Sequence, residues 1–283
     1  MLLLVLPATG CILRSHRVEP MQVSHAKLQS ATVTDLVNRI NNEAHEIRTL
    51  NATVDIATSV GGGKSGKVTE YQEIRGYILV RQPGMLRMIG LTPVVRTRAF
   101  DMVSKGADFE LYVPPQRKLY VGKNDVAVNG STGLTAMRPQ IIYNALLLID
   151  IDPQSDIAVV ESGQEVVTDP KSHQNFQQPD YRLDIIHHGA KGWFLERKIY
   201  FNRATLQPRH QRVFNDKGHA VSDMQYRDWK QYQGLWFPAV IEIWRPIEEY
   251  RITLGVVKLE LNQNLTDQQF ALTTPADTKV MQD

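Results

Sequence analysis

The segment Gly61 to Lys67 is the first in this chain whose residue types and spacing could support chemistry. It satisfies the Gly-x-x-x-x-Gly-Lys part of a phosphate-binding loop. Such a loop also needs a Ser or Thr hydroxyl for magnesium and a helix whose N-terminus faces the phosphates. Val68 occupies the hydroxyl position, and the residues after it have the pattern of a strand. The segment is therefore predicted to be a flexible hairpin tip.

The histidines and carboxylates give little support to catalysis. No Gly-x-Ser-x-Gly elbow occurs, and His187-His188 has neither a helical His-x-x-x-His partner nor an obvious carboxylate pair. Adjacent strand residues point to opposite faces, so one histidine should point inward and the other outward. Acidic residues are expected to cap a turn or to lie at solvated edges: Asp150, Asp152, Glu161 to Glu165 and Glu248-Glu249. We predict no enzyme activity, no metal site and no cofactor.

Composition narrows the class of protein further. The chain has 283 residues, a formal charge of +2 and an ordinary balance of 42% hydrophobic and 22% charged residues. This charge gives no electrostatic reason to expect a nucleic-acid partner. One large β-rich domain over residues 31–283 is favoured, because such domains commonly fold as a single unit.

The single cysteine, Cys11, follows the apolar run Met1 to Gly10, which closes in small residues like the end of a secretory signal. Ala8-Thr9-Gly10-Cys11 resembles the lipobox of bacterial lipoproteins, where the cysteine is acylated after cleavage. We therefore expect a signal-peptide remnant at residues 1–10, lipidation at Cys11 and a lipid-anchored tether over residues 11–30. The alternative is an apolar N-terminus with a buried thiol.

Periodicity predicts one amphipathic helix followed by many strands. Thr32-Val-Thr-Asp35 fits a capping box, and apolar residues then recur at helical spacing as far as Ile47. A strand follows over Leu50 to Val60, and the hairpin Glu73 to Gly90 carries apolar groups on both faces. We expect one face of this hairpin to pack on the helix and the other to line a groove.

The remaining chain predicts an antiparallel meander. Strands are expected at Val94 to Val103 and Phe109 to Val113, and then at short intervals from Asp156 to Leu261, with Asp169 to Pro179 as a surface loop. Gln140 to Leu148 breaks the pattern as a short, apolar helix. It is either a lid over an apolar groove or a plug for one end of the core.

Two segments carry a family resemblance, namely Gly76 to Arg87, with the pattern Gly-x-apolar-x-apolar-x-x-Pro-x-x-x-Arg, and Phe270 to Pro275. With the order of elements over about residues 30 to 280, they resemble the LolA/LolB superfamily of lipoprotein-sorting proteins. The resemblance implies an α+β, mainly β fold. Its sheet would be an incomplete, strongly curved antiparallel barrel, with an N-terminal helix and short helices covering the concave face.

The resemblance also implies a function. In that family the groove takes up acyl chains of lipoproteins, such as palmitate, and anchored members act as receptors at the outer membrane. Cys11 makes this chain similar to the anchored kind, on the periplasmic face of the outer membrane, with a periplasmic carrier protein as a possible partner. Ile12, not aspartate, follows the cysteine, which is compatible with outer-membrane sorting. Anchored receptors carry a protruding apolar loop, and soluble carriers hold the lid with an arginine, a role open to Arg87, Arg96 or another.

The groove and lid are expected to involve apolar residues of several strands and of the short helix. The expected residues, or their alternates on the same strands, are Leu79, Leu86, Met88, Leu111, Ile141, Ile142, Leu146, Ile185, Phe201 and Val240. An apolar face of this size stays exposed unless something fills it. The competing hypothesis is a structural or assembly lipoprotein that fills the groove with its own side chains.

Overall fold

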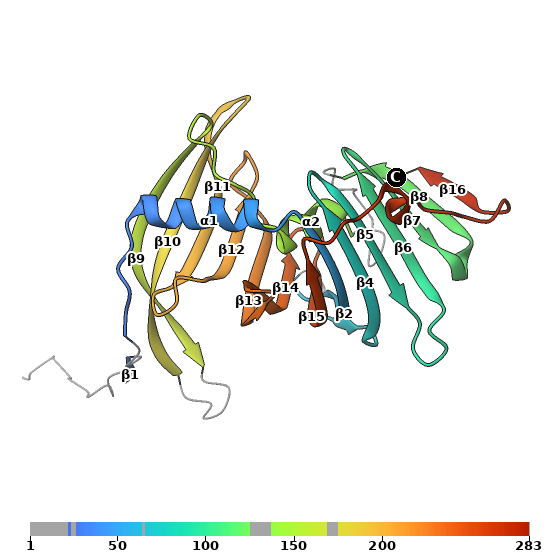
Figure 1. Cartoon of the computed structure of the whole chain (residues 1–283), viewed down its shortest axis with the longest axis horizontal. Coiled ribbons are helices and arrows are strands. Elements are labelled where there is room, and N and C mark those ends of the chain that lie inside the picture. Colours follow the sequence, from blue (N-terminus) through green and yellow to red (C-terminus); the bar gives the residue numbers. More distant parts are fainter. Residues whose placement is uncertain (1–21, 24–26, 64–65, 125–136, 169–174, 283) are drawn as a thin grey trace, which may run out of the picture.

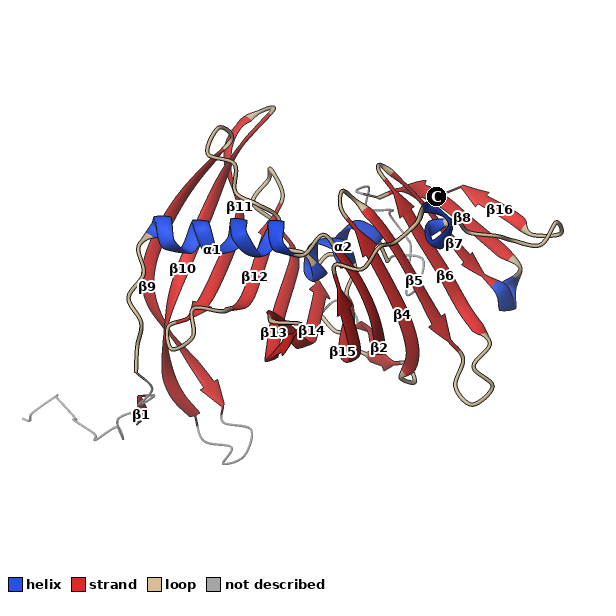
Figure 2. Ribbon diagram, in the orientation of Figure 1, coloured by secondary structure: helices blue, strands red, loops and turns tan. Residues whose placement is uncertain are grey.

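The computed structural model describes residues 22–23, 27–63, 66–124, 137–168 and 175–282. Strands dominate the chain and form one curved 16-stranded sheet (Figures 1 and 2). The sheet order is β1-β10-β11-β12-β13-β14-β15-β2-β4-β5-β6-β7-β8-β16, with β3 paired to β2 and β9 to β10. The ends of this order do not pair among the described strands, so the sheet stays open. The predicted half-barrel is confirmed.

Eight of the described strands lie in the N-terminal half of the chain. They are β1 (Gln22–Val23), β2 (Thr49–Gly61), β3 (Val68–Glu70), β4 (Ile74–Arg81), β5 (Met85–Leu91), β6 (Arg98–Lys105), β7 (Asp108–Val113) and β8 (Lys118–Lys123). The later strands are β9 (Asp156–Thr168), β10 (Asn175–Gly189), β11 (Gly192–Asn202), β12 (Pro208–Phe214), β13 (Ala220–Tyr232), β14 (Leu235–Arg245), β15 (Tyr250–Leu261) and β16 (Lys279–Gln282). Pairing is antiparallel except at β1 with β10 and β16 with β8.

Two α-helices and two 3-10 helices complete the described chain. They are α1 (Val33–Glu46), α2 (Pro139–Leu146), η1 (Pro114–Gln116) and η3 (Asp267–Phe270). Helix α1 begins with the expected capping box, because Thr32 accepts a hydrogen bond from the Asp35 amide and donates its own amide to the Asp35 carboxylate. Within the described part of the chain, no helix has both the length and the apolar character to span a membrane.

Cross-strand register shows which residues share the inner face of the sheet. One row of directly paired residues runs across five strands, through Ile199, Gln211, Met224, Ile243 and Ile252. Cross-strand partners lie on the same face, so the cores built on the two ends of this row share the inner face. Both α-helices cross this face (Figure 1).

Helix α1 packs on the strands β9 to β11. Its Leu36 and Ile40 are buried against Leu183, Ile185 and Phe201. The expectation that the hairpin Glu73 to Gly90 packs on this helix is therefore wrong. An amphipathic pattern shows that a helix has a buried face but does not show which strands cover it.

The outer face of the hairpin is covered by the C-terminal segment. Leu265 and Phe270 pack with Val103 and Leu79 in a separate small core. Arg81 donates to the Leu265 carbonyl, at 2.6 Å, and Arg87 donates to the Gln269 carbonyl, at 2.9 Å. Helix η3 is thereby fixed against β4 to β6.

Four other sequence expectations need correction. Residues 92–97 form a turn and β6 starts only at Arg98, because Val94 and Arg96 have positive φ angles that a strand does not allow. Residues 175–179 belong to β10, while 169–174 lie outside the described residues. Part of the expected tether, Gln22–Val23, pairs with β10. Glu248 is not a solvated edge, because Arg245 binds its carboxylate at 2.7 Å and only 10% of its side chain is exposed.

Candidate functional site

Helix α2 lies against the middle of the inner face, over β5, β6 and β14. Pro139 starts the helix, where the missing amide hydrogen costs nothing. Its Ile142, Ala145 and Leu146 are buried in the main core, and Ile141 packs against that core from a half-buried position. Leu86, Met88 and Leu111 of the sheet belong to the same core and are fully buried.

Two residues expected in the groove lie on the other face of the sheet. Leu79 packs on the outer face with Phe270, whereas its neighbours Ile78 and Val80 point to the main core. Val240 is half-buried, and its neighbours Ala239 and Ile241 are buried, with Ile241 in the main core. All three residues of each stretch are apolar, so hydrophobic alternation did not reveal which of them face inward.

Over β9 to β11, the inner face is filled by the protein itself. Ile185 and Phe201 are fully buried beneath Leu36 and Ile40 of α1. Of the expected groove residues, these two therefore face a helix and leave no open space there. Among the described residues, α1 covers the inner face over β9 to β11, α2 covers it over β5, β6 and β14, and a cavity remains beside α2.

This cavity is apolar and has a volume of about 520 Å³. This volume falls in the roughly 300–1,000 Å³ range of small-molecule sites. Strand residues from β2, β4, β6 and β15 form most of its wall, and Met137, just before α2, closes one side. The lining is Ile56, Thr58, Ser59, Val60, Tyr71, Gln72, Ile74, Pro93, Phe100, Gln116, Met137, Tyr250, Arg251 and Ile252. Sequence reasoning missed these residues, although Ile56, Ile74 and Ile252 alternate correctly for an inner face.

An apolar turn lies at the edge of this cavity. Pro93 lines the cavity, and the next two residues point away from the protein, with Val94 96% exposed and Val95 72% exposed. Thr92 and Thr97 close the turn, since the Thr92 amide donates to the Thr97 carbonyl at 2.7 Å. Val94 has a φ of 66°, which is unusual for a β-branched residue. The fold therefore presents two valines to solvent beside an apolar opening.

An arginine also lies at the start of α2. The Arg138 guanidinium sits 5.1 Å from the Phe109 ring centroid, and the side chain is buried. Neither arginine named from the sequence is there. Arg87 pairs with Asp101 and Gln269 on the outer face, and Arg96 lies in the turn of residues 92–97, called the valine turn below. Arg138 was not singled out in the sequence because it precedes the helix and has no charged neighbour there.

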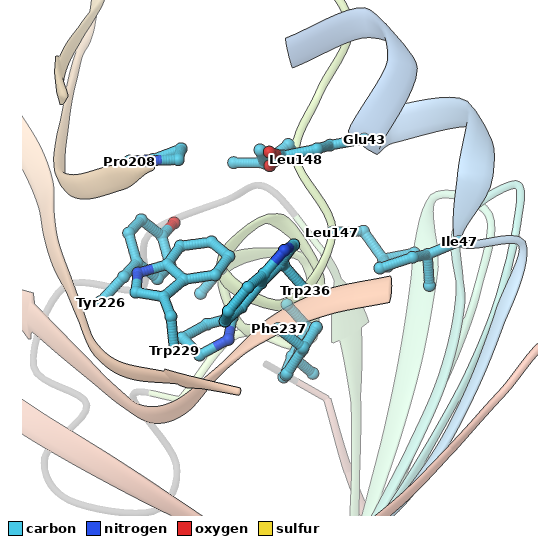
Figure 3. A pocket seen from close by; sticks show the side chains of 12 residues that line it. Glu43, Ile47, Leu147, Leu148, Pro208, Tyr226, Trp229, Trp236 and Phe237 are labelled. Carbon is cyan, nitrogen blue, oxygen red and sulfur yellow. The ribbon is translucent and has the colours of Figure 1, made fainter. Parts of the chain in front are cut away.

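A second, smaller cleft lies between α1 and the β13–β14 hairpin. Figure 3 shows Glu43 above a group of aromatic rings from that hairpin, beside Leu148. The free volume is about 30 Å³, which suits a few water molecules and excludes an acyl chain. Burial raises the pKa of Glu43 to about 7, although Arg39 pairs with it at 3.2 Å. This cleft therefore holds a carboxyl with a raised pKa and has no room for a large ligand. The larger cavity is the candidate binding site.

The hairpin tip at Gly61 to Lys67 behaves as predicted where it is described. Strand β2 ends at Gly61 and β3 begins at Val68, antiparallel to it. A strand, not a helix N-terminus, follows the glycines, so the geometry for phosphate binding is missing there. The predicted lipidation site Cys11 lies outside the described residues.

Comparison with known proteins finds solved structures with a similar fold. No family model matches the sequence, and no curated protein matches it either. The solved structures that are similar in fold include three with a TM-score above 0.5. A DUF1329 family protein from Desulfovibrio piger is 14% identical, with 84% of this chain and 95% of that chain covered and a TM-score of 0.54.

The other two are a LolA superfamily protein from Nitrosomonas europaea and a putative outer membrane lipoprotein-sorting protein domain from Vibrio parahaemolyticus. The first is 12% identical, over 86% of this chain and 99% of that one, with a TM-score of 0.51. The second is 13% identical, over 83% and 94%, with the same TM-score of 0.51. The resemblance to the LolA/LolB superfamily is confirmed for the fold.

Proposed function

We propose that this protein binds acyl chains of lipoproteins or other lipids in the cavity beside α2. The observation that carries the proposal is the cavity itself, an apolar space of about 520 Å³ on the inner face of the sheet. Apolar walls with a few polar groups at the edge, here Gln72, Gln116 and Arg251, suit a chain that ends in a polar headgroup.

The energetics favour a reversible carrier or receptor. Each methylene removed from water contributes about 0.8 kcal/mol, but a donor membrane offers the same gain. Net transfer then depends on small differences between the two environments. Displacement of α2, which covers the middle of the inner face, is one way to change the depth of the cavity.

The sequence and the fold together support a proposed location. We infer lipidation at Cys11 and attachment to the periplasmic face of the outer membrane, which would put the cavity near its ligands. The lipoprotein-sorting domain with the same fold supports an envelope role. The exposed Val94 and Val95 match the protruding apolar loop of anchored receptors. A periplasmic carrier protein would be the donor of the acylated ligand.

A matched pair of substitutions tests the cavity. Thr58 lines the cavity, while Ala57 is the adjacent residue of β2 and points to the other face. The full chain carrying Cys11→Ser is titrated with a fluorescent palmitate analogue and analysed by native mass spectrometry. We expect saturable binding that Thr58→Trp reduces at least about tenfold, a loss of roughly 1.4 kcal/mol, and that Ala57→Trp leaves unchanged. Absence of uptake and of co-purified acyl ligand would sink the proposal.

One observation favours a second candidate function. Helices α1 and α2 already bury most of the inner face with the protein's own side chains, as a structural or assembly lipoprotein would. If the protein's own residues fill the remaining cavity in solution, palmitate will not bind, and Thr58→Trp will lower stability by overpacking without affecting any ligand. The titration described above therefore separates the two candidates.

The lipid anchor is tested separately. Mass spectrometry of peptides from membranes of the native host should show Cys11 with acyl chains. An unmodified thiol in those membranes would remove the anchor from the proposal and leave the cavity untouched.

A further inference from the structure

His187 has a carboxylate partner that the sequence did not reveal. Asp156, 31 residues earlier in the chain, pairs with it across β9 and β10, and the His187 Nδ1 lies 2.7 Å from the Asp156 Oδ1. Both residues lie on the inner face, because His187 alternates with Ile185 and Asp156 with Ala158. They are at the end of β10, away from the acyl-chain cavity. The absence of a carboxylate pair for His187, stated from the sequence, is therefore corrected.

A β-bulge brings a second carboxylate to the same place. Ile185 pairs with Arg197 and Ile186 with Leu195, so Glu196 is an extra residue in β11. A bulge changes the direction of a side chain that regular alternation would turn away. One ligand atom each from Asp156, His187 and Glu196 lie within 4.8 Å of one another.

These separations suit a metal ion after small side-chain rotations. Bonds of about 2.1 Å in a tetrahedral site put ligand atoms ~3.4 Å apart. The 2.7 Å between His187 and Asp156 is shorter than that because a proton lies between them, and an ion would replace the proton and separate the two atoms. The third ligand atom, within 4.8 Å, would move inward.

The surroundings fix the ligands and balance the charge. The Asp152 amide donates to the second oxygen of Asp156 at 2.9 Å, which orients that carboxylate. The Arg197 Nε donates to the Glu196 carboxylate at 3.1 Å. Two carboxylates and one guanidinium therefore leave a net negative charge where the ion would bind. His187 and Glu196 are 32% and 30% exposed, which gives an ion access from solvent.

We propose that Asp156, His187 and Glu196 form a binding site for a divalent transition-metal ion such as Zn²⁺, with water completing the coordination. An imidazole with two carboxylates suits such ions better than it suits magnesium or calcium, which prefer all-oxygen sites. The ion joins β9, β10 and β11. Through Asp152 and Arg197 it also stiffens the segment after α2, because Arg197 donates to the carbonyls of Ile149, at 2.7 Å, and Asp150, at 3.1 Å.

His188 provides a matched control for the test. It is the next residue of β10, is exposed, and packs on Trp193 with ring centroids 4.7 Å apart. The full chain carrying Cys11→Ser, which removes the only cysteine, is stripped with a chelator and titrated with Zn²⁺ against a chromogenic indicator. We expect one equivalent to bind, with affinity reduced at least about tenfold in His187→Gln and in Glu196→Gln and retained in His188→Gln.

Thermal unfolding gives a second readout for the same variants. Zn²⁺ should raise the Tm of the parent and of His188→Gln, because an ion that binds only the folded state stabilises it. The Tm of His187→Gln and Glu196→Gln should not respond, and circular dichroism without metal checks that both are folded. Absence of saturable binding in the parent, or equal affinity in His187→Gln and His188→Gln, would overturn the site.

Discussion

Asp101 is a fully buried carboxylate held by two arginines on the outer face of the sheet. Arg87 binds it through two nitrogens, at 3.0 and 2.7 Å, and Arg98 binds it at 3.0 Å. The side chain of Arg87 is 14% exposed, whereas that of Arg98 is 42% exposed, so Arg87 supplies most of the buried compensation. Loss of one partner from a buried pair leaves a charge without adequate solvation.

The first prediction concerns Arg87→Met. We expect it to lower the free energy of unfolding by about 3–5 kcal/mol, measured by urea denaturation, because Asp101 stays buried with one partner fewer. Lys191→Met is the control, since its ammonium pairs with Asp216 at 2.9 Å while 80% exposed. That change should cost less than about 1 kcal/mol. Equal losses in the two variants would contradict the role of Arg87.

Glu43 makes stability depend on pH. Burial raises its pKa from 4.5 to about 7, so the folded state holds a proton that the unfolded state releases between these values. Stability therefore falls as pH rises from about 4.5 to about 7. Glu43→Gln removes this penalty but also loses the ion pair with Arg39, which is worth only about 0.5 kcal/mol.

The second prediction follows from that sign. Near pH 8, Glu43→Gln should be more stable than the parent by up to about 3 kcal/mol, and near pH 4 the difference should vanish. Urea denaturation across the pH range measures it, with the exposed Glu70→Gln as a control that should give no such trend. A difference between Glu43→Gln and the parent that is independent of pH would show that burial does not raise the pKa of this carboxyl.

At the residue scale, sequence reasoning was limited because some strands are apolar on both faces. It expected Leu79, Leu86, Met88 and Leu111 on one face lining a groove, whereas the structure buries the last three in the main core and puts Leu79 on the outer face. A shift of one residue moves a side chain to the other face, and the apolar stretch Ile78-Leu79-Val80 gives no contrast to fix the register. Thr58 and Gln116 line the cavity, but their residue types do not indicate a binding site before the strands are placed.

At the scale of elements, the C-terminal segment acts as a cover for the outer face of β4 to β6. Phe270 is fully buried, and the Arg81 guanidinium lies 5.3 Å from its ring centroid. A capping box at Thr266 and Gln269 starts η3 and places this ring. The family resemblance had marked Phe270 to Pro275, and the structure gives the physical reason at Phe270.

The third prediction is that Phe270→Ala lowers the free energy of unfolding by about 3–5 kcal/mol. The ring is the largest side chain in the small outer core, and its removal leaves a cavity beside Leu265 and Val103. Chemical denaturation measures the loss. Val280→Ala in β16, where the side chain is 60% exposed, should change stability by no more than about 0.5 kcal/mol. A similarly small change for Phe270→Ala would show that η3 is not fixed by this ring.

Elements were predicted well where the pattern is local and poorly where it depends on distant contacts. The capping box of α1 and the bounds of β11 to β14 follow from nearby residues. By contrast, β9 and β10 extend far beyond the strands that the sequence predicts at Ile157 to Val160 and Tyr181 to His187, because Glu161 to Glu165 and residues 175–179 are mostly polar. Long strands of this kind are stabilised by pairing with each other and by ion pairs such as Arg182 with Glu161, at 3.7 Å.

At the scale of the whole molecule, one open sheet combines a filled half and a partly open half. Helix α1 closes the side of β9 to β11, and the cavity remains on the side of β2, β4 and β6. The valine turn belongs to the open side, since Pro93 lines the cavity. In the proposed function, these exposed valines would contact a membrane where an acyl chain enters or leaves the cavity.

The fourth prediction tests that arrangement. In the full chain carrying Cys11→Ser, changing both Val94 and Val95 to Ser should lower affinity for lipid vesicles at least about tenfold. Burial of each valine is worth about 1.5–3 kcal/mol, and a loss of 1.4 kcal/mol is tenfold. Sedimentation with vesicles measures this affinity. Stability should change by no more than about 0.5 kcal/mol, because both side chains are exposed.

The same double variant separates membrane contact from ligand binding. Because Val94 and Val95 point away from the cavity, affinity for the fluorescent palmitate analogue should stay at the parent value while its transfer to vesicles slows. Val257→Ser is the control, since that side chain is 53% exposed on β15, three strands away from β5 in the sheet order, and should leave transfer unchanged. If the double variant transfers palmitate as fast as the Val257→Ser protein, the membrane meets another part of the molecule and the valine turn has no role in delivery.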